Sequence, residues 1–377
     1  MIYLNNASTS FPKPDLVINE VLNYLKNVPN NYGRGSTYRS DYIKEVRDLI
    51  KNFFNANDDY FNIFTSGSTE SLNLVIKGLN LENKEVIITA NEHNSVIRPL
   101  KYLENKGKIN LNIVDIDTFA EINLEHLNSL ITEKTALVVI NAISNVTGTV
   151  QNLLEIAKIL KQRNILLLID GSQLAGNYPI NLSEIDADFF AYTGHKSLFG
   201  MQGIGGLIFK KNVYFEPLKY GGTGFRSNYL YQPVELPHHY ESGTQNIPGI
   251  ISLKKGIEFI NEVGLENIIK HKEELMNKVI NNLQNYECVK IYKPAKNYSN
   301  SVLSFTIDNI TPEELSYILK SSFDIEVRAG LHCCPLIHKY LGTEKFGTIR
   351  ISPSYFTTED EIDTFNNAIS KIIEEFK

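Results

Sequence analysis

The chain has 377 residues, 42% of them hydrophobic, which is enough for two domains around a shared cleft. Its formal net charge of −6 leaves no basic excess to neutralise phosphates, which argues against a nucleic-acid partner. No apolar segment is long enough to cross a bilayer and no secretory signal pattern opens the chain, so we expect a cytoplasmic protein with no membrane association.

Short apolar strands alternate with helical periodicity over residues 61–209. Strands are predicted at 61–64, 85–89, 136–141, 165–169, 189–192 and 206–209, and helices at 70–79, 96–106 and 153–163. This alternation predicts a mostly parallel sheet with helices on both faces. Ligands of such sheets bind beyond the carboxyl ends of the strands, where the candidate residues described below fall.

Residues 220–248 are interrupted by glycines and prolines and predict a long functional loop. The segments beyond it are helices at 250–263, 266–283, 312–321 and 358–376 and strands at 301–307 and 347–352, with Thr358 and Glu361 forming a capping box. We expect the helix at 250–263 to bridge the domains. The predicted division is a large domain at 16–250 and a small α+β domain at 1–15 and 251–377, with the N-terminal segment near the active site.

Asp170 and Lys196 give the sequence its main chemical clue. Asp170 ends a continuously apolar strand, and Lys196 follows 26 positions later, which predicts that a carboxylate and an amine meet on neighbouring strands. Pyridoxal phosphate (PLP) enzymes need this pair, because the acid keeps the pyridinium nitrogen protonated and the lysine forms a Schiff base. Taken singly, Asp170 is equally well explained as a helix cap, and a lysine such as Lys196 is far more often a surface residue.

A phosphate site is predicted where small residues precede a helix, at Ser68 and Thr69. Thr193 and His195 flank the lysine and add two donors to the same phosphate. His93 follows the strand at 85–89, where an imidazole can stack on a flat cofactor and relay protons. Each of these residue types is also common in loops without a ligand.

Asn145 and Gln173 each follow a predicted strand and are candidates to bind the phenolic oxygen of the cofactor. The three cysteines are Cys288, Cys333 and Cys334, which form no disulfide framework and no CxxC pair, so we expect a reducing compartment and no metal site.

The chain resembles the class V aminotransferase family of fold-type I PLP enzymes, and within it the cysteine desulfurase and selenocysteine lyase group. YLNNAST at 3–9 is similar to that family's YLDNAAT, and FTSGSTESLNLV, NEHNSV, SNVTG, DGSQ and TGHK follow in the family's order. The resemblance implies a mostly parallel seven-stranded sheet with a smaller α+β C-terminal domain. It also implies that Lys196 forms the Schiff base, that Asp170 partners the pyridinium nitrogen, and that the cofactor is held by Ser68, Thr69, His93, Asn145, Gln173, Thr193 and His195.

The same resemblance extends to the substrate, the thiol and the partner subunit. Segment 328–334, RAGLHCC, is similar to the desulfurase loop whose cysteine is the nucleophile, which implies that Cys333 is catalytic, with Arg328 and His332 favouring its thiolate. Arg350 matches the arginine that clamps the substrate carboxylate, with Arg328 and Asn145 nearby. Thr244 corresponds to a residue that reaches the neighbouring subunit's phosphate, which implies a homodimer.

We therefore predict a PLP-dependent cysteine desulfurase that converts L-cysteine to L-alanine, forms a persulfide on Cys333 and passes the sulfur to a thiol or an acceptor protein. Cys334 stands where alanine is common and is predicted to intercept the persulfide, slow the cycle or protect it. The alternatives are a lyase acting on L-selenocysteine, another aminotransferase or β-lyase of this fold, and a non-catalytic sulfur carrier or scaffold.

Overall fold

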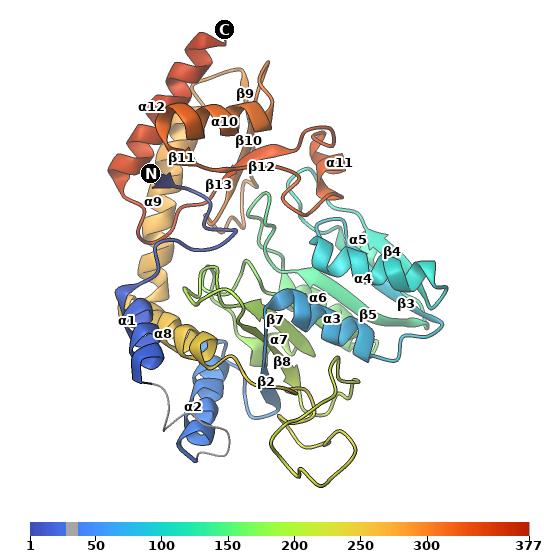
Figure 1. Ribbon diagram of the computed structural model, residues 1–377. Coiled ribbons are helices and arrows are strands. Elements are labelled where there is room, and N and C mark those ends of the chain that lie inside the picture. The colour runs from blue at the N-terminus through green and yellow to red at the C-terminus, as the bar shows by residue number, and fades with distance from the viewer. Residues whose placement is uncertain (28–36, 377) are drawn as a thin grey trace.

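The computed structural model describes residues 1–27 and 37–376, and its largest sheet has seven strands (Figure 1). In spatial order these strands are β2 (Tyr60–Thr65), β8 (Gly205–Lys210), β7 (Phe189–Thr193), β6 (Leu166–Asp170), β5 (Thr135–Asn141), β3 (Lys84–Thr89) and β4 (Ile109–Val114). Only β8 runs antiparallel to its neighbours, so the predicted mostly parallel seven-stranded sheet is confirmed.

Helices cover both faces of this sheet, as predicted. Alternation along β6 shows why: Leu167 and Ile169 belong to one buried cluster, whereas Leu168 belongs to the other. The helices of this part of the chain are α1 (Asp15–Asn27), α2 (Thr37–Phe53), α3 (Ser68–Gly78), α4 (Asn94–Asn105), α5 (Leu124–Leu130), α6 (Leu153–Lys161), α7 (Leu182–Ile185) and α8 (Ile247–Val263). Because both faces are buried, the strands read as nearly continuous apolar runs.

The C-terminal part carries a separate four-stranded antiparallel sheet in the order β12-β13-β10-β9. Its elements are α9 (Leu265–Leu283), β9 (Val289–Tyr292), β10 (Leu303–Ile307), α10 (Pro312–Phe323), β11 (Ile325–Glu326), β12 (Arg328–Gly330), α11 (Ile337–Leu341), β13 (Thr348–Ile351) and α12 (Glu359–Glu375). The predicted capping box of Thr358 and Glu361 opens α12. Strand β1 (Ile2–Tyr3) pairs in parallel with β11, which draws the N-terminus into this part.

The bridge between the two parts is α9, and the prediction that the helix at 250–263 forms it is wrong. Ile250, Leu253 and Ile257 of α8 all belong to the hydrophobic cluster of the large sheet. By contrast, α9 begins with Ile268 in that cluster and continues with Leu275 in the cluster of the C-terminal part. The separate clusters support two domains, and the division at residue 250 remains a proposal, since α8 packs with the large sheet.

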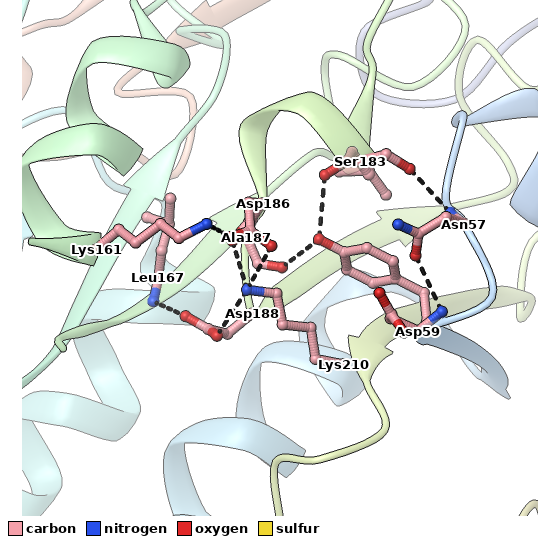
Figure 2. A network of polar contacts seen from close by, with 11 residues as sticks. Asn57, Asp59, Lys161, Leu167, Ser183, Asp186, Ala187, Asp188 and Lys210 are labelled. Atoms are coloured by element: carbon pink, nitrogen blue, oxygen red, sulfur yellow. Dashed lines mark hydrogen bonds and ion pairs between the residues drawn. The ribbon is translucent and has the colours of Figure 1, made fainter.

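A polar network fixes the ends of β6, β7 and β8 that lie away from their ligand-binding edge (Figure 2). The Lys210 amine lies 2.8 Å from an Asp186 oxygen and 3.4 Å from an Asp188 oxygen. Asp188 also accepts a 2.8 Å hydrogen bond from the backbone N–H of Leu167. The network therefore joins three strands where their backbone polar groups leave the sheet. Across the described ranges no helix is long and apolar enough to span a membrane.

Candidate active site

A cavity of about 410 Å³ opens at the carboxyl ends of the parallel strands. Asp170 ends β6, Thr193 ends β7, and His93 follows β3, so the topology delivers all three side chains to one edge. Predicted site residues lining the cavity are Ser68, Thr69, His93, Asn145, Asp170, Gln173, Thr193, His195, Lys196, Arg328 and Arg350. Cys333 and Thr244 do not line it.

Lys196 lies three residues beyond the end of β7, in a loop and not on the strand itself. Burial lowers the pKa of its amine to about 8, an effect that the Asp170 carboxylate opposes. The guanidinium groups of Arg350 and Arg328 lower it further. Lys196 is therefore an amine that gives up its proton readily near neutral pH, as a nucleophilic lysine must.

Asp170 is 3% exposed, and Ser172, two residues further along the chain, binds one of its carboxylate oxygens. The backbone N–H of Ser172 donates to Asp170 Oδ1 at 2.9 Å, and the Ser172 hydroxyl also donates to that oxygen. The Ser172 hydroxyl lies 2.6 Å from the Ser68 hydroxyl at the start of α3. Hydrogen bonds from Ser172 therefore fix the orientation of Asp170 toward the cavity.

The turn before α3 brings backbone N–H groups to the cavity wall. Gly67 is the N-cap of α3, with φ of 149°, a conformation that a residue with a Cβ rarely adopts. Its lack of a side chain leaves the N-terminus of α3 open, since no side chain caps it. Thr69 Oγ1 lies 2.8 Å from Ser95 Oγ, which ties this turn to the loop of His93. Such a helix terminus favours an anion.

His93 faces the cavity as a neutral imidazole. Burial and the nearby Lys196 amine lower its pKa to about 4. Its Nδ1 accepts a 3.1 Å hydrogen bond from the backbone N–H of Ser95, so the proton of the neutral ring is carried by Nε2. His93 therefore offers an N–H donor to whatever binds in the cavity.

Five buried polar atoms of the lining residues have no partner within the described chain: Asn145 Oδ1, Gln173 Oε1, His195 Nδ1, His332 Nδ1 and Arg350 Nε. The other ends of two of these side chains are fixed, because Asn145 Nδ2 donates to the His332 carbonyl at 2.8 Å and Gln173 Nε2 donates to the Ala7 carbonyl at 3.0 Å. Buried polar atoms without partners are costly, so these positions fit a polar ligand.

Two arginines meet across the small sheet, where Arg328 of β12 pairs in register with Arg350 of β13. The Ser8 hydroxyl accepts a 3.0 Å hydrogen bond from Arg328 and a 3.1 Å hydrogen bond from Arg350. Arg350 is 1% exposed, donates to the Asn145 carbonyl at 2.9 Å, and keeps Nε unpartnered. Neither arginine pairs with an acid among residues 1–27 and 37–376, so this corner suits a carboxylate ligand.

Cys333 lies at the rim of the cavity and is exposed. Arg328 Nη2 lies 3.2 Å from its sulfur, which fits the predicted contact of a cation with the thiol. The turn is tight, since His332 and Cys333 have positive φ values of 51° and 59°. The backbone N–H of Asn94 donates to the Cys333 carbonyl at 2.8 Å, which couples the thiol loop to the loop of His93.

The predicted help from His332 is wrong. Its ring is 3% exposed, and Nε2 contacts the carbonyl and the hydroxyl of Thr348 instead of the Cys333 sulfur. Burial and the Arg350 charge lower its pKa well below the usual value, so the ring is neutral and supplies no positive charge to the thiol.

The predicted roles of Cys334 in intercepting a persulfide are also wrong. Its side chain is fully buried and its thiol donates to the carbonyls of Asn91 and Glu92, each at 3.2 Å. Burial raises the pKa of this thiol well above its usual value. A buried, protonated thiol cannot attack a persulfide at the rim, and Cys334 instead anchors the loop behind Cys333.

Thr244 is placed apart from the other predicted residues. It lines a neighbouring cavity of about 160 Å³, together with Ser66, Glu70 and Gly203, which also line the main cavity. Sequence analysis missed several residues that line the main cavity or hold its groups, namely Ser8, Ser66, Ser95, Asn141, Ser172 and Gln202. Most are short polar residues of loops, whose composition alone gives no signal.

The cavity places a carboxylate, an amine, an imidazole and two arginines together, as an enzyme active site would. The aminotransferase class-V family model matches residues 2–365, and the chain belongs to this family. A protein from Borreliella burgdorferi described as "Probable cysteine desulfurase" is 32% identical over 100% of this chain and 92% of its own length. One from Halalkalibacterium halodurans with the same description is 33% identical, over 100% of this chain and 94% of its own.

A solved structure of similar fold is an apo cysteine desulfurase from Thermococcus onnurineus NA1. It is 28% identical, its TM-score is 0.90, and the match covers 99% of this chain and 95% of that one. These findings confirm the family resemblance and the fold-type I architecture that the motifs predicted.

Proposed function

We propose that this chain is a PLP-dependent cysteine desulfurase that converts L-cysteine to L-alanine and carries the released sulfur as a persulfide on Cys333. The observation that carries the proposal is one juxtaposition. Asp170, Lys196 and His93 share a single cavity, and Cys333 stands at its rim, 3.2 Å from the cavity-lining Arg328. The similarity to proteins described as cysteine desulfurases supports the same activity.

The residues of the cavity fit PLP. The cavity offers a polar ligand three groups: the unpartnered Asn145 Oδ1 and Gln173 Oε1, and the Asp170 carboxylate that Ser172 orients. In this proposal Asp170 holds the pyridinium nitrogen, Lys196 forms the covalent link, and His93 covers the ring. The phosphate is held by Ser68, Thr69, Thr193 and His195. When bound, PLP supplies an electron sink for charge developing at the substrate α-carbon.

Substrate binding follows from the two arginines. Arg350 is buried and presents a free Nε, so it can clamp the α-carboxylate with its planar fork. With the carboxylate held there, the α-carbon lies between the arginine corner and Lys196. The Lys196 amine, whose pKa is lowered to about 8, takes the α-proton in its neutral form, and the Nε2–H of His93 donates a proton during release of the products.

Sulfur transfer belongs to Cys333. Its thiolate attacks the substrate sulfur, a new S–S bond forms, and the bond between that sulfur and the substrate β-carbon breaks. The sulfur stays on Cys333 as a persulfide and the carbon skeleton leaves as alanine after it gains protons. The exposed position of Cys333 then leaves the persulfide open to an acceptor thiol or protein.

The test is a product balance of the PLP-loaded protein. The chain and its Cys333→Ala variant are given L-cysteine or L-selenocysteine with a reductant, and alanine and sulfide or selenide are quantified, with Cys288→Ala as the matched control. We expect equal amounts of alanine and sulfide, abolished by Cys333→Ala and unchanged by Cys288→Ala. Alanine formation from cysteine that survives Cys333→Ala would refute the mechanism, and consumption of selenocysteine alone would make the enzyme a selenocysteine lyase.

Thr244 is proposed to act on the cofactor phosphate of a second copy of the chain, because it lies outside the main cavity of its own chain. Mixing Lys196→Ala chains with Thr244→Ala chains tests this. If sites are shared, the mixed dimer contains one intact site and activity reappears. If Thr244 serves its own chain, every site in the mixture stays defective.

A further inference from the structure

Ser8 and Asn5 are the two positions at which YLNNAST differs from the motif YLDNAAT that it resembles, and the structure brings them into contact. The Ser8 hydroxyl donates to Asn5 Oδ1 at 2.7 Å. The same hydroxyl oxygen accepts hydrogen bonds from Arg328 and Arg350. A serine hydroxyl has one donor and two acceptor lone pairs, so all of its hydrogen-bonding capacity is used.

This arrangement answers an electrostatic problem of the small sheet. Arg328 and Arg350 are directly opposed on antiparallel strands, and like charges in that position repel. Since no acid pairs with either one within the described ranges, the Ser8 oxygen is the group that lies between their guanidiniums. Asn5 keeps the hydroxyl hydrogen turned away from both arginines, so that only lone pairs face them.

The segment that carries Ser8 is held firmly in place. The backbone N–H of Ala7 donates to Ser352 Oγ at 2.8 Å, and Asn6 Nδ2 donates to the Ser352 carbonyl at 3.0 Å. Ser352 directly follows β13, the strand of Arg350. The position of Ser8 is therefore set by hydrogen bonds of the two preceding residues to Ser352 and does not depend on the arginines themselves.

The guanidinium of Arg328 contacts two side chains. Nη1 contacts the Ser8 hydroxyl at 3.0 Å, and Nη2 contacts the Cys333 sulfur at 3.2 Å. We propose that Ser8, with its hydroxyl oriented by Asn5, is a positioning residue that holds Arg328 against the sulfur of Cys333 and thereby makes that thiol reactive before any substrate binds. Without the oxygen, repulsion from Arg350 displaces the Arg328 guanidinium toward solvent and away from the sulfur.

The proposal deepens the proposed function, on which its catalytic consequence rests, but its first test needs neither cofactor nor substrate. The rate of alkylation of Cys333 by iodoacetamide at pH 7 is measured by peptide mass spectrometry in chains that carry Cys288→Ala. We expect Ser8→Ala to slow alkylation about 3- to 10-fold, the scale of losing one net hydrogen bond. Ser8→Thr, which keeps the hydroxyl, should restore most of the rate. Ser129→Ala, on the exposed helix α5, is the matched control and should change nothing.

Alanine formation from L-cysteine is then measured in the same PLP-loaded variants. We expect kcat to fall with the alkylation rate in Ser8→Ala, while KM changes less because Arg350 keeps its contact with the Asn145 carbonyl. Alkylation of Ser8→Ala at the parental rate would overturn the positioning role, whatever the activity. If Ser8→Ala slows alkylation but the parent chain forms no alanine from either substrate, the role of Ser8 stands and the desulfurase function alone is refuted.

Discussion

Lys272 is a buried amine with no acidic partner among the described residues, and replacing it tests how this fold tolerates charge. It lies on α9, is 3% exposed, and donates to Asn177 Oδ1. The cavity beside it measures about 10 Å³, too little for more than one water, and no aspartate or glutamate lines it. Burial lowers the pKa of the Lys272 amine from 10.5 to about 7.

The magnitude follows from that pKa. A fall from 10.5 to about 7 means that the protonated amine destabilises the fold by up to about 5 kcal/mol, since each pH unit corresponds to about 1.4 kcal/mol. Below pH 7 the cation is buried and the whole cost is present. From pH 7 to 10.5 the unfolded chain binds the proton while the native chain does not, so stability rises with pH. The cost has vanished above pH 10.5.

We therefore expect Lys272→Met to stabilise the chain more at pH 6 than at pH 9.5. Methionine keeps the length of the side chain and removes the charge, at a loss of about 1 kcal/mol for the hydrogen bond to Asn177. The gain in free energy of unfolding should be about 3 to 4 kcal/mol at pH 6 and close to zero at pH 9.5.

The measurement is urea unfolding followed by far-ultraviolet circular dichroism, because the chain has no tryptophan for fluorescence. Lys270→Met is the matched control, on the same helix but with a side chain 76% exposed, and it should show no such pH dependence. A Lys272→Met effect that agrees at the two pH values to within about 1 kcal/mol would refute the reasoning, because it would mean that the amine pays no desolvation cost.

Three further outcomes are expected. Glu92→Gln should stabilise the chain more at pH 8 than at pH 5 in urea unfolding. Burial raises the pKa of this carboxyl to about 8, so the stability of the parent chain falls as pH rises between 4.5 and 8. Equal effects at both pH values would contradict this prediction. His93→Gln should lower kcat for alanine formation about 100-fold or more while PLP stays bound, as judged by its visible absorbance, and parental kcat would exclude a proton-transfer role. Lys210→Met should lower the free energy of unfolding by about 1 to 3 kcal/mol, since it leaves Asp186 and Asp188 without their shared cation. An unchanged urea midpoint would mean that the network of Figure 2 does not stabilise the sheet.

The central sheet was predictable because its strands are buried on both faces and read as apolar runs. The strand that sequence analysis missed is β4, INLNIV, which lies at the sheet edge and carries partly exposed side chains at three of its central positions. An edge strand gives a weaker signal than a central one, because its side chains are less completely buried. Helices α1 and α2 were missed as well, since their exposed apolar and charged residues mask the periodicity.

The candidate site was predictable where a residue ends a strand, and not where loops fold back on it. Asp170 and Thr193 end apolar strands and His93 lies in the loop after one, so strand position placed them at one edge. Cys334 and His332 adjoin Cys333 in sequence but are turned into the core, because positive φ values at His332 and Cys333 reverse the chain there. Sequence adjacency says nothing about which side of such a turn a side chain occupies.

The N-terminal segment shows how the two parts of the chain complete one site. The Ala7 carbonyl accepts a 3.0 Å hydrogen bond from Gln173 Nε2, on the side of the large sheet. The Ala7 N–H donates a 2.8 Å hydrogen bond to Ser352 Oγ, on the side of the small sheet. Ser10 continues this span, with its hydroxyl 2.8 Å from the Lys196 carbonyl. The loop of Lys196 and the strand of the arginines are thus held by contacts to the same few residues. Relative movement of the two parts must then break hydrogen bonds of this segment, so the segment holds the loop of Lys196 and the strand of Arg350 at a fixed spacing.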